Sequence, residues 1–214
     1  SIQGFKEAIF KADVASAQTT IKKESKTITF TWETPQNITV KKVITFLADS
    51  YMINCDIIFQ NGSSMPLNDD LVIMIPNLFN DEIKKKARFA YEGPLIFLNS
   101  EFQKLKPDDI EEKDTHHGII DWVGYTDQYF LTCLMPKTAQ DSKLKMTYKG
   151  DIVTSYFFQP MERLDPGKQT SYSFVYYLGP KSTEILSQYD NNLKEAIYFG
   201  WFDILAKPLL MIMN

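Results

Sequence analysis

The stretch TITFTWETPQNITVKKVITFLADSYMINCDIIFQNG, residues 27–62, decides the fold. Its first part alternates apolar side chains with threonines, which is the period of a β-strand that buries one face. The apolar positions are Ile28, Phe30 and Trp32. Two runs rich in β-branched and aromatic residues follow at 39–47 and 51–60, and the turn signal Asn61-Gly62 ends them. The spacing predicts consecutive antiparallel hairpins.

The strand pattern continues outward from this stretch to residue 178. Further runs of strand character lie at 71–75, 87–91, 95–98, 119–124, 128–135, 144–148, 152–159 and 170–178. A strong turn signal, Asp165-Pro166-Gly167-Lys168, precedes the last of them. Roughly ten short strands with few helical interruptions predict a mainly β protein, a large twisted antiparallel β-sandwich.

The hydrophobic period changes after Gly179-Pro180 from two to about 3.6 residues. Proline suits the first position of a helix, where its missing N–H costs nothing. One helical face then carries Leu186, Tyr189, Leu193 and Ile197. We therefore expect an N-terminal arm or partial strands over 1–26, a sandwich over 27–179, and a C-terminal helical linker over 180–214.

The linker ends in an unusually aromatic and apolar segment, 196–214, with the sequence AIYFGWFDILAKPLLMIMN. On a helix, its small and polar residues form one narrow stripe that apolar side chains surround. Aromatic rings of this kind favour the headgroup zone of a membrane, and aliphatic side chains lie deeper. The predicted membrane-interface residues are Tyr198, Phe199, Trp201, Phe202, Ile204, Leu205 and Leu209.

Docking of this segment on the core of the protein itself remains open as the alternative. No stretch reaches about 18 uninterrupted apolar residues, so the sequence predicts no membrane-spanning helix. Both ends of the chain read as cut from a longer one. The 214 residues allow one large domain with a full core, and a net charge of −4 argues against a nucleic-acid partner.

The sequence offers little chemistry for an enzyme. His116 and His117 are the only histidines, and neighbours in a strand point to opposite sides, so both cannot face one substrate. We expect them to be solvated in a charged loop over 108–118. No GxSxG elbow, HExxH metal spacing or glycine-rich phosphate loop occurs. The sequence therefore predicts no catalytic residue, no metal site and no cofactor.

The two cysteines, Cys55 and Cys133, each lie in a strand-like apolar run, which predicts burial. A disulfide between them stays open, because two cysteines are too few to indicate a framework. A carbohydrate-binding or mutarotase-like sandwich is an alternative function, since exposed aromatic rings stack on sugars. Its candidates are Trp32, Trp122, Tyr148, Tyr156 and Tyr177. A scaffold protein unrelated to membranes is a third possibility, favoured if the C-terminal segment is buried.

Three blocks of the sequence resemble the periplasmic domain of the YidC membrane protein insertase family. The first runs from Gly118 to Pro136 and contains Trp122, Tyr129 and Phe130. The second is the junction Leu178-Gly179-Pro180-Lys181, and the third is YFGWF at 198–202 followed by AKPL at 206–209, with Gly200 and Pro208. The likeness covers roughly residues 27–214, whereas 1–26 do not resemble the strands that open the domain in Gram-negative members.

The resemblance implies a supersandwich similar to galactose mutarotase, with structural roles for Trp122, Tyr129, Phe130, Gly179, Pro180, Gly200 and Pro208. It implies a non-enzymatic accessory domain that faces the periplasm at the bacterial inner membrane. The family inserts and folds membrane proteins, alone or with the Sec translocon, so the implied partners are SecD, SecF, nascent membrane proteins and the bilayer surface. The catalytic set of the carbohydrate enzymes has no match in this sequence.

Overall fold

The computed structural model describes residues 2, 5–14, 16, 18, 20–21, 23–80, 82–83, 91–106, 110, 114–189 and 191–197. Its strands are β1 (Lys11–Ala12), β2 (Lys26–Glu33), β3 (Ile38–Phe46), β4 (Met52–Asn61), β5 (Leu71–Leu78), β6 (Gly93–Leu98), β7 (Glu101–Lys104), β8 (Thr115–Thr126), β9 (Phe130–Pro136), β10 (Asp141–Lys149), β11 (Ile152–Gln159) and β12 (Gln169–Pro180). Short helical elements among the described residues include η1 (Phe5–Glu7), α2 (Thr183–Leu186) and η3 (Leu193–Ala196).

These strands pair antiparallel and form two sheets that share β8. The large sheet has the order β1-β2-β3-β4-β12-β9-β8-β6-β7. The small sheet has the order β8-β10-β11-β5. The prediction of a mainly β, antiparallel sandwich is therefore confirmed, and the hairpins expected in residues 27–62 are β2, β3 and β4.

Strand β8 passes from the small sheet into the large one. Its first part, 115–119, pairs with β10, and its last part, 123–126, pairs with β9. Near the crossing, Gly118 has a φ of 142°, and a Cβ there would lie 2.6 Å from Asn99 Oδ1. That oxygen accepts the backbone N–H of Ile119 at 2.9 Å. The crossing therefore requires a residue without a side chain at Gly118.

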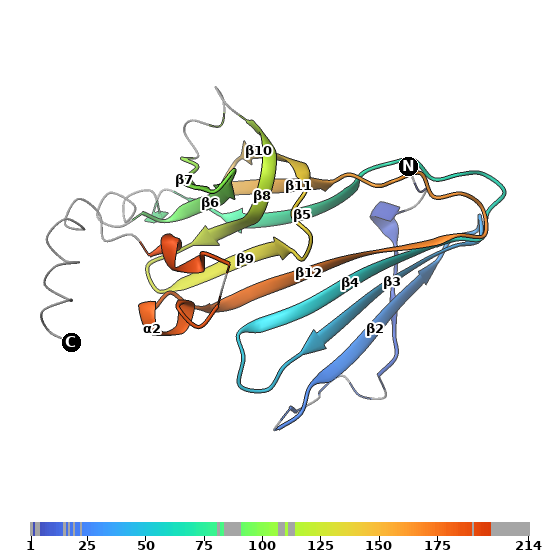
Figure 1. The fold of residues 1–214 in the computed structure, drawn as a ribbon, viewed down its shortest axis with the longest axis horizontal. Helices are drawn as coiled ribbons and strands as arrows, with labels where there is room; N and C mark the ends of the chain where they lie inside the picture. Colours follow the sequence, from blue (N-terminus) through green and yellow to red (C-terminus); the bar gives the residue numbers. More distant parts are fainter. Residues whose placement is uncertain are drawn as a thin grey trace, which may run out of the picture.

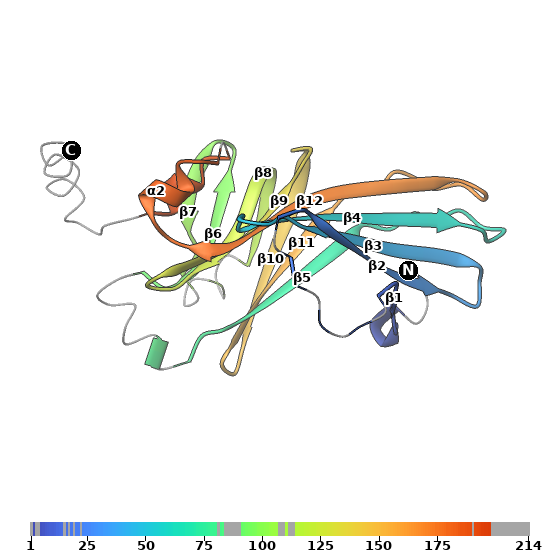
Figure 2. The ribbon, with the colours of Figure 1, turned by 90° about the horizontal axis from the view of Figure 1, so that it is seen from below.

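Figure 1 shows the arrangement of the two sheets. Strands β2, β3 and β4 fan out on one side of β12, while β8, β10, β11 and β5 lie on its other side. The N-terminal arm lies beside the fan, at the end of the molecule opposite α2. Figure 2, turned by 90°, shows α2 and β5 on opposite sides of β12.

Two buried clusters account for this arrangement. The first fills the space between the sheets and includes Ile120, Leu134, Phe157 and Phe174. The second lies on the other face of the large sheet, under α2 and η3. It is made of Leu95, Phe97, Trp122, Leu131, Cys133, Met135, Tyr177, Leu186, Leu193 and Ala196. The large sheet is thus covered by apolar contacts on both faces around β9 and β12.

The N-terminal arm packs against the fan through aromatic contacts. The rings of Phe5 and Phe10 lie 5.6 Å and 6.1 Å from the ring of Trp32, between centroids. The Nζ atom of Lys42 lies 4.2 Å from the centroid of the Phe10 ring. Asp13 Oδ1 accepts the backbone N–H of Thr29 at 2.8 Å, so the arm covers part of the β2 edge.

The C-terminal region differs from the predicted continuous helix. Its four periodic apolar residues do share one face, since Leu186 and Leu193 are buried and Tyr189 and Ile197 pack against the same cluster. The helical turns are short, however, and Asn192 between them has a φ of 55°, a left-handed conformation that interrupts a right-handed helix. Pro180 belongs to β12 rather than to the first turn of a helix.

Candidate functional site

The candidate functional site is the end of the sandwich where the β8–β9 turn, the end of β12 and α2 meet. Trp122, from the first motif block, is fully buried in β8. Its ring stacks on Phe97 with centroids 5.9 Å apart and lies 6.0 Å from the ring of Phe102. These contacts fix β8 against β6 and β7, so the turn that follows β8 projects from a rigid base.

The β8–β9 turn presents two aromatic rings to solvent. Asp127 Oδ1 accepts the backbone N–H groups of Tyr129 at 2.7 Å and of Phe130 at 2.6 Å. This carboxylate therefore holds the turn in one conformation. The side chains of Tyr129 and Phe130 are 66% and 55% exposed. Exposed neighbouring aromatics on a braced turn are suited to contact an apolar or interfacial surface.

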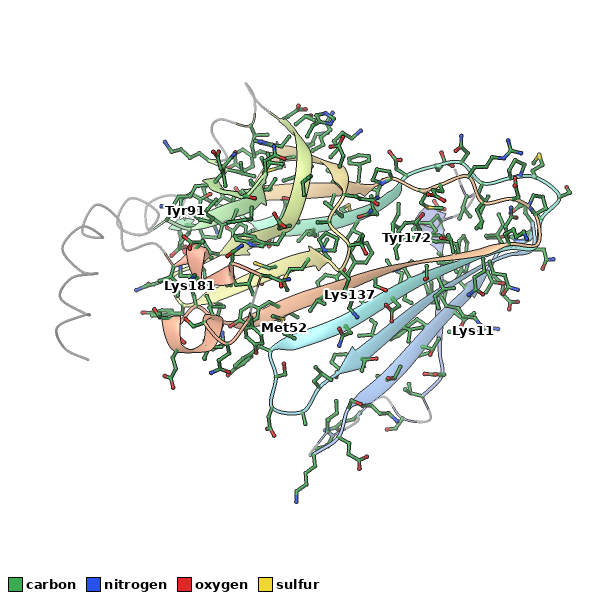
Figure 3. The ribbon with its side chains drawn as sticks, in the orientation of Figure 1. Lys11, Met52, Tyr91, Lys137, Tyr172 and Lys181 are labelled. Atoms are coloured by element: carbon green, nitrogen blue, oxygen red, sulfur yellow. The ribbon has the colours of Figure 1, made fainter. Side chains whose placement is uncertain are left out.

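Lys181 joins the end of β12 to this turn. Its backbone N–H donates to Tyr129 O at 2.7 Å. Its Nζ atom donates to Thr126 Oγ1 at 2.9 Å and to Asp127 O at 2.6 Å. Burial lowers the pKa of Lys181, against the opposing effect of the carboxylates of Asp127 and Glu92. Figure 3 shows Lys181 at the same end of the molecule as Tyr91.

The second motif block, Leu178 to Lys181, forms a tightly packed junction. Gly179 is buried, and a Cβ there would lie 2.6 Å from Tyr51 Cγ and 2.8 Å from Tyr177 Oη. The hydroxyl of Tyr177 donates to Pro180 O at 2.7 Å. Ser182 then caps α2, because its side chain accepts the N–H of Ile185. The motif therefore leads into α2, whose Leu186 is buried in the same cluster as Tyr177.

After this junction the structure describes the chain as far as Ile197, except for residue 190. Leu186, Leu193 and Ala196 are buried against the large sheet, and Ile197 packs beside them. The predicted membrane-interface residues and two motif residues lie outside the described residues: Tyr198, Phe199, Trp201, Phe202, Ile204, Leu205 and Leu209, with Gly200 and Pro208. Within the described part of the chain, no helix is long and apolar enough to cross a bilayer.

The two histidines were expected in a loop, and that expectation is wrong. Both lie in β8, where His116 is buried and His117 is exposed. They do point to opposite sides, because residues alternate along a strand. Among the described residues, no group of three or more His, Cys, Asp or Glu side chains is placed to hold a metal ion.

The cysteines lie on opposite faces of the large sheet. Cys55 belongs to the cluster between the sheets and Cys133 to the cluster under α2, and both are free thiols. Burial raises the pKa of Cys55, and it raises that of Cys133 well above the usual value. Neither thiol is therefore activated as a nucleophile.

The aromatic residues considered for sugar binding are buried or half-buried. Trp122 and Tyr177 are inaccessible, and Trp32, Tyr148 and Tyr156 are intermediate. The residues that brace the exposed turn, Asp127 and Lys181, lay within two of the motif blocks, but sequence reasoning assigned neither a role of its own. A signal existed for Asp127, because an aspartate side chain in a turn commonly accepts a hydrogen bond from the backbone N–H two residues further on.

Comparison with protein families gives one match over nearly the whole chain. The model of the YidC periplasmic domain matches residues 2–212. A membrane protein insertase YidC from Pelobacter propionicus is 30% identical over 207 residues, which cover 95% of this chain and 38% of that protein. The Geobacter metallireducens insertase YidC is 29% identical over 209 residues, with the same coverages. The chain thus spans less than half the length of these relatives.

Solved structures share the fold at low identity. The GH36 α-galactosidase AgaA from Geobacillus stearothermophilus superposes with a TM-score of 0.56 at 8% identity, over 84% of this chain and 28% of that one. An Escherichia coli K12 protein proposed to be an aldose 1-epimerase gives 0.50 at 9% identity, over 80% of this chain and 68% of its own. The predicted mutarotase-like sandwich is confirmed at the level of the fold alone, and the α-galactosidase shares this fold.

Proposed function

Because the chain belongs to the YidC periplasmic domain family, we propose that it is the periplasmic accessory domain of an inner-membrane protein insertase. In this role it assists the insertion and folding of membrane proteins, alone or beside the Sec translocon. Its partners are nascent membrane proteins and the Sec subunits SecD and SecF. Its own residues hold no cofactor and perform no catalysis.

The observation that carries the proposal is the fixed start of the apolar C-terminal segment. Leu193 and Ala196 are buried on the large sheet, and Ile197 packs against the same cluster. The predicted membrane-interface residues, which begin at Tyr198, therefore follow in the sequence directly after a packed part of the sandwich. A segment that lies in the bilayer surface would orient the whole domain. The exposed rings of Tyr129 and Phe130 belong to the same candidate site and would add to this contact.

A carbohydrate-binding function is not favoured by a specific observation. The glycosidase neighbours are 8% to 9% identical, which supports the fold and not an activity. The named relatives are insertases, which is consistent with a non-enzymatic domain.

The proposal is tested by flotation with vesicles of phosphatidylethanolamine and phosphatidylglycerol. The intact chain is compared with one that ends at Ile197, a cut that keeps the buried Leu193 and Ala196. Circular dichroism checks that both are folded. The intact chain is expected to float and the shortened chain to stay at the bottom, because aromatic anchors supply about 1–3 kcal/mol each when buried.

Two single changes refine this test. Trp201→Ala and Phe202→Ala are each expected to weaken flotation while the thermal midpoint of unfolding stays unchanged. If either change unfolds the sandwich, the segment belongs to the core. If the intact and shortened chains both remain unbound and folded, the membrane role of the segment is rejected.

A further inference from the structure

The outer face of the small sheet carries an apolar strip. Residues alternate along β5 and β11, and one set of them, which includes Ile73, Ile75 and Phe157, packs into the core. The other set faces outward and consists of Val72, Met74, Pro76 and Leu78 on β5 with Ile152, Thr154, Tyr156 and Phe158 on β11. The register pairs each β5 member with one on β11, so the strip is two strands wide and four rows long.

The β5 side of this strip is open to solvent, whereas on β11 Tyr156 and Phe158 are half-buried and Thr154 is buried. Met74 and Leu78 are 60% and 53% exposed, and Val72 and Ile152 are exposed as well. Several exposed large apolar side chains on one continuous sheet face are uncommon in a monomeric domain and indicate an interaction surface.

Lysines run along one side of the strip. Strand β10 lies next to β11, and its outward positions include Lys143, Lys145 and Lys149. Lys143 lies opposite Phe158 in the register, and its Nζ atom is 4.0 Å from the centroid of that ring. Lys145 Nζ lies 3.4 Å from Asp114 Oδ2, which partly neutralises it. The strip therefore has positive charge along the β10 side.

The other side of the strip is the free edge of the sheet. Strand β5 has the sequence LVIMIPNL and carries no charged residue. Its edge is poorly suited to accept another strand. Along β5 the backbone groups of successive residues point alternately to β11 and to the free edge. Phe79 points to β11, because its N–H donates to Asp151 O. The even-numbered residues of β5 therefore direct their backbone groups to the free edge. There Pro76 lacks an N–H, and Leu78 O already accepts the hydroxyl of Tyr125 at 2.9 Å.

The dimensions of the strip fit a helix. Two neighbouring strands span roughly 10 Å across, which equals the diameter of an α-helix with its side chains. Six residue steps from Val72 to Leu78 cover roughly 20 Å, the length of about 13 helical residues. A helix that lies along the strip would place one of its sides beside the β10 lysines.

We propose that this strip is the docking surface for an amphipathic helix of a partner protein, with an apolar face on Met74 and Tyr156 and carboxylates beside Lys143 and Lys149. The inference rests on the proposed function, because the partner is a protein that interacts with the insertase. It does not depend on any residue of the C-terminal segment. A bilayer is a poorer fit, because its headgroups would favour cations on both sides of the strip.

The test places the photo-crosslinking residue benzoylphenylalanine at Met74 in the full insertase that carries this domain, in living cells. Ser171, an exposed polar residue of β12 in the large sheet, is the matched control position. After irradiation, mass spectrometry identifies the attached segment. The expected result is a protein adduct at position 74, absent at 171, whose attached segment is an amphipathic helix with acidic residues on one flank.

Charge reversal supplies the second criterion. The pair Lys143→Glu and Lys149→Glu is expected to lower the adduct yield roughly tenfold, because like charges then face each other. The corresponding pair of changes to Gln should lower it less. A lipid adduct, a segment without acidic residues, equal yields at positions 74 and 171, or no effect of charge reversal would each overturn the proposal.

Vesicle flotation separates this inference from the proposed function. Met74→Glu is expected to abolish the protein adduct when the photo-crosslinker is placed at Tyr156, and to leave flotation of the chain unchanged. An intact adduct in the Met74→Glu variant would overturn the docking proposal. If the chain without this change fails to float while its adduct at position 74 forms, the proposed membrane contact is rejected and the docking surface stands.

Discussion

The Nζ atom of Lys181 lies 2.6 Å from the carbonyl oxygen of Asp127, across a separation of 54 residues in the chain. This bond ties the end of β12 to the β8–β9 turn, and the same lysine donates to Thr126 Oγ1. The turn that exposes Tyr129 and Phe130 is thereby fixed to the strand that leads into α2. The candidate site is one rigid unit and not a set of independent loops.

Replacing this lysine tests the connection. Lys181→Met keeps the length of the side chain and removes its two hydrogen bonds. Because the change also removes a partly buried charge, the net loss in the free energy of unfolding is expected to be modest, about 1 kcal/mol. Urea denaturation measures it. Lys137→Met, at an exposed lysine, is the control and should leave the midpoint unchanged.

The carboxylate of Asp127 is predicted to order the turn through its acceptor oxygen and not through its charge. Asp127→Ala removes the acceptor for the N–H groups of Tyr129 and Phe130, whereas Asp127→Asn keeps an oxygen in place. Hydrogen exchange at these two amides is expected to accelerate strongly in the alanine variant and weakly in the asparagine variant. Equal acceleration in both would show that the charge is the stabilising feature.

Gly179 is predicted to be required by packing. In Gly179→Ala the new methyl group would lie 2.6 Å from Tyr51 Cγ and 2.8 Å from Tyr177 Oη. Such overpacking costs typically about 1–3 kcal/mol of stability. Tyr51 is partly exposed, so Tyr51→Ala makes room for the methyl group. The double variant is expected to lose less stability than the sum of the two single changes, and strict additivity would contradict the packing explanation.

The sequence predicted the hairpins of residues 27–62 because local alternation sets strand boundaries. The observed strands β2, β3 and β4 begin and end within a few residues of the expected ones. Features that depend on distant pairing were missed. The division of β8 between two sheets rests on contacts with β10, β9 and β6, and nothing local in its sequence indicates it.

The candidate site shows the same limit. The motif residues Trp122, Gly179 and Pro180 were found from resemblance, and the structure brings them to one end of the sandwich. The contact of Lys181 with Asp127 joins residues 54 positions apart, so no periodicity indicates it. The continuous helix predicted after Pro180 was wrong because Asn192 adopts a left-handed conformation, which a polar residue near a turn tolerates at little cost.

The last prediction concerns stability at alkaline pH. Burial, with a smaller effect of Cys55, raises the pKa of Tyr176 from 10.0 to about 12. The folded state therefore holds this proton where the unfolded state has lost it. The resulting stability is fully present below pH 10 and is lost as the pH rises towards 12. Two pKa units correspond to on the order of 2–3 kcal/mol.

Tyr176→Phe removes this titration, and urea denaturation at several pH values measures the effect. The variant is expected to lose less stability than the parent between pH 10 and 12, with Tyr129→Phe at the exposed turn as the matched control.

Lys181 acts in the opposite sense, because burial lowers its pKa and stability then rises with pH below about 10.5. The comparison is therefore repeated in the Lys181→Met background. There the chain with Tyr at position 176 should still lose more stability between pH 10 and 12 than the chain with Phe. Identical slopes for the parent and Tyr176→Phe in both backgrounds would rule out Tyr176 as the source of the alkaline instability.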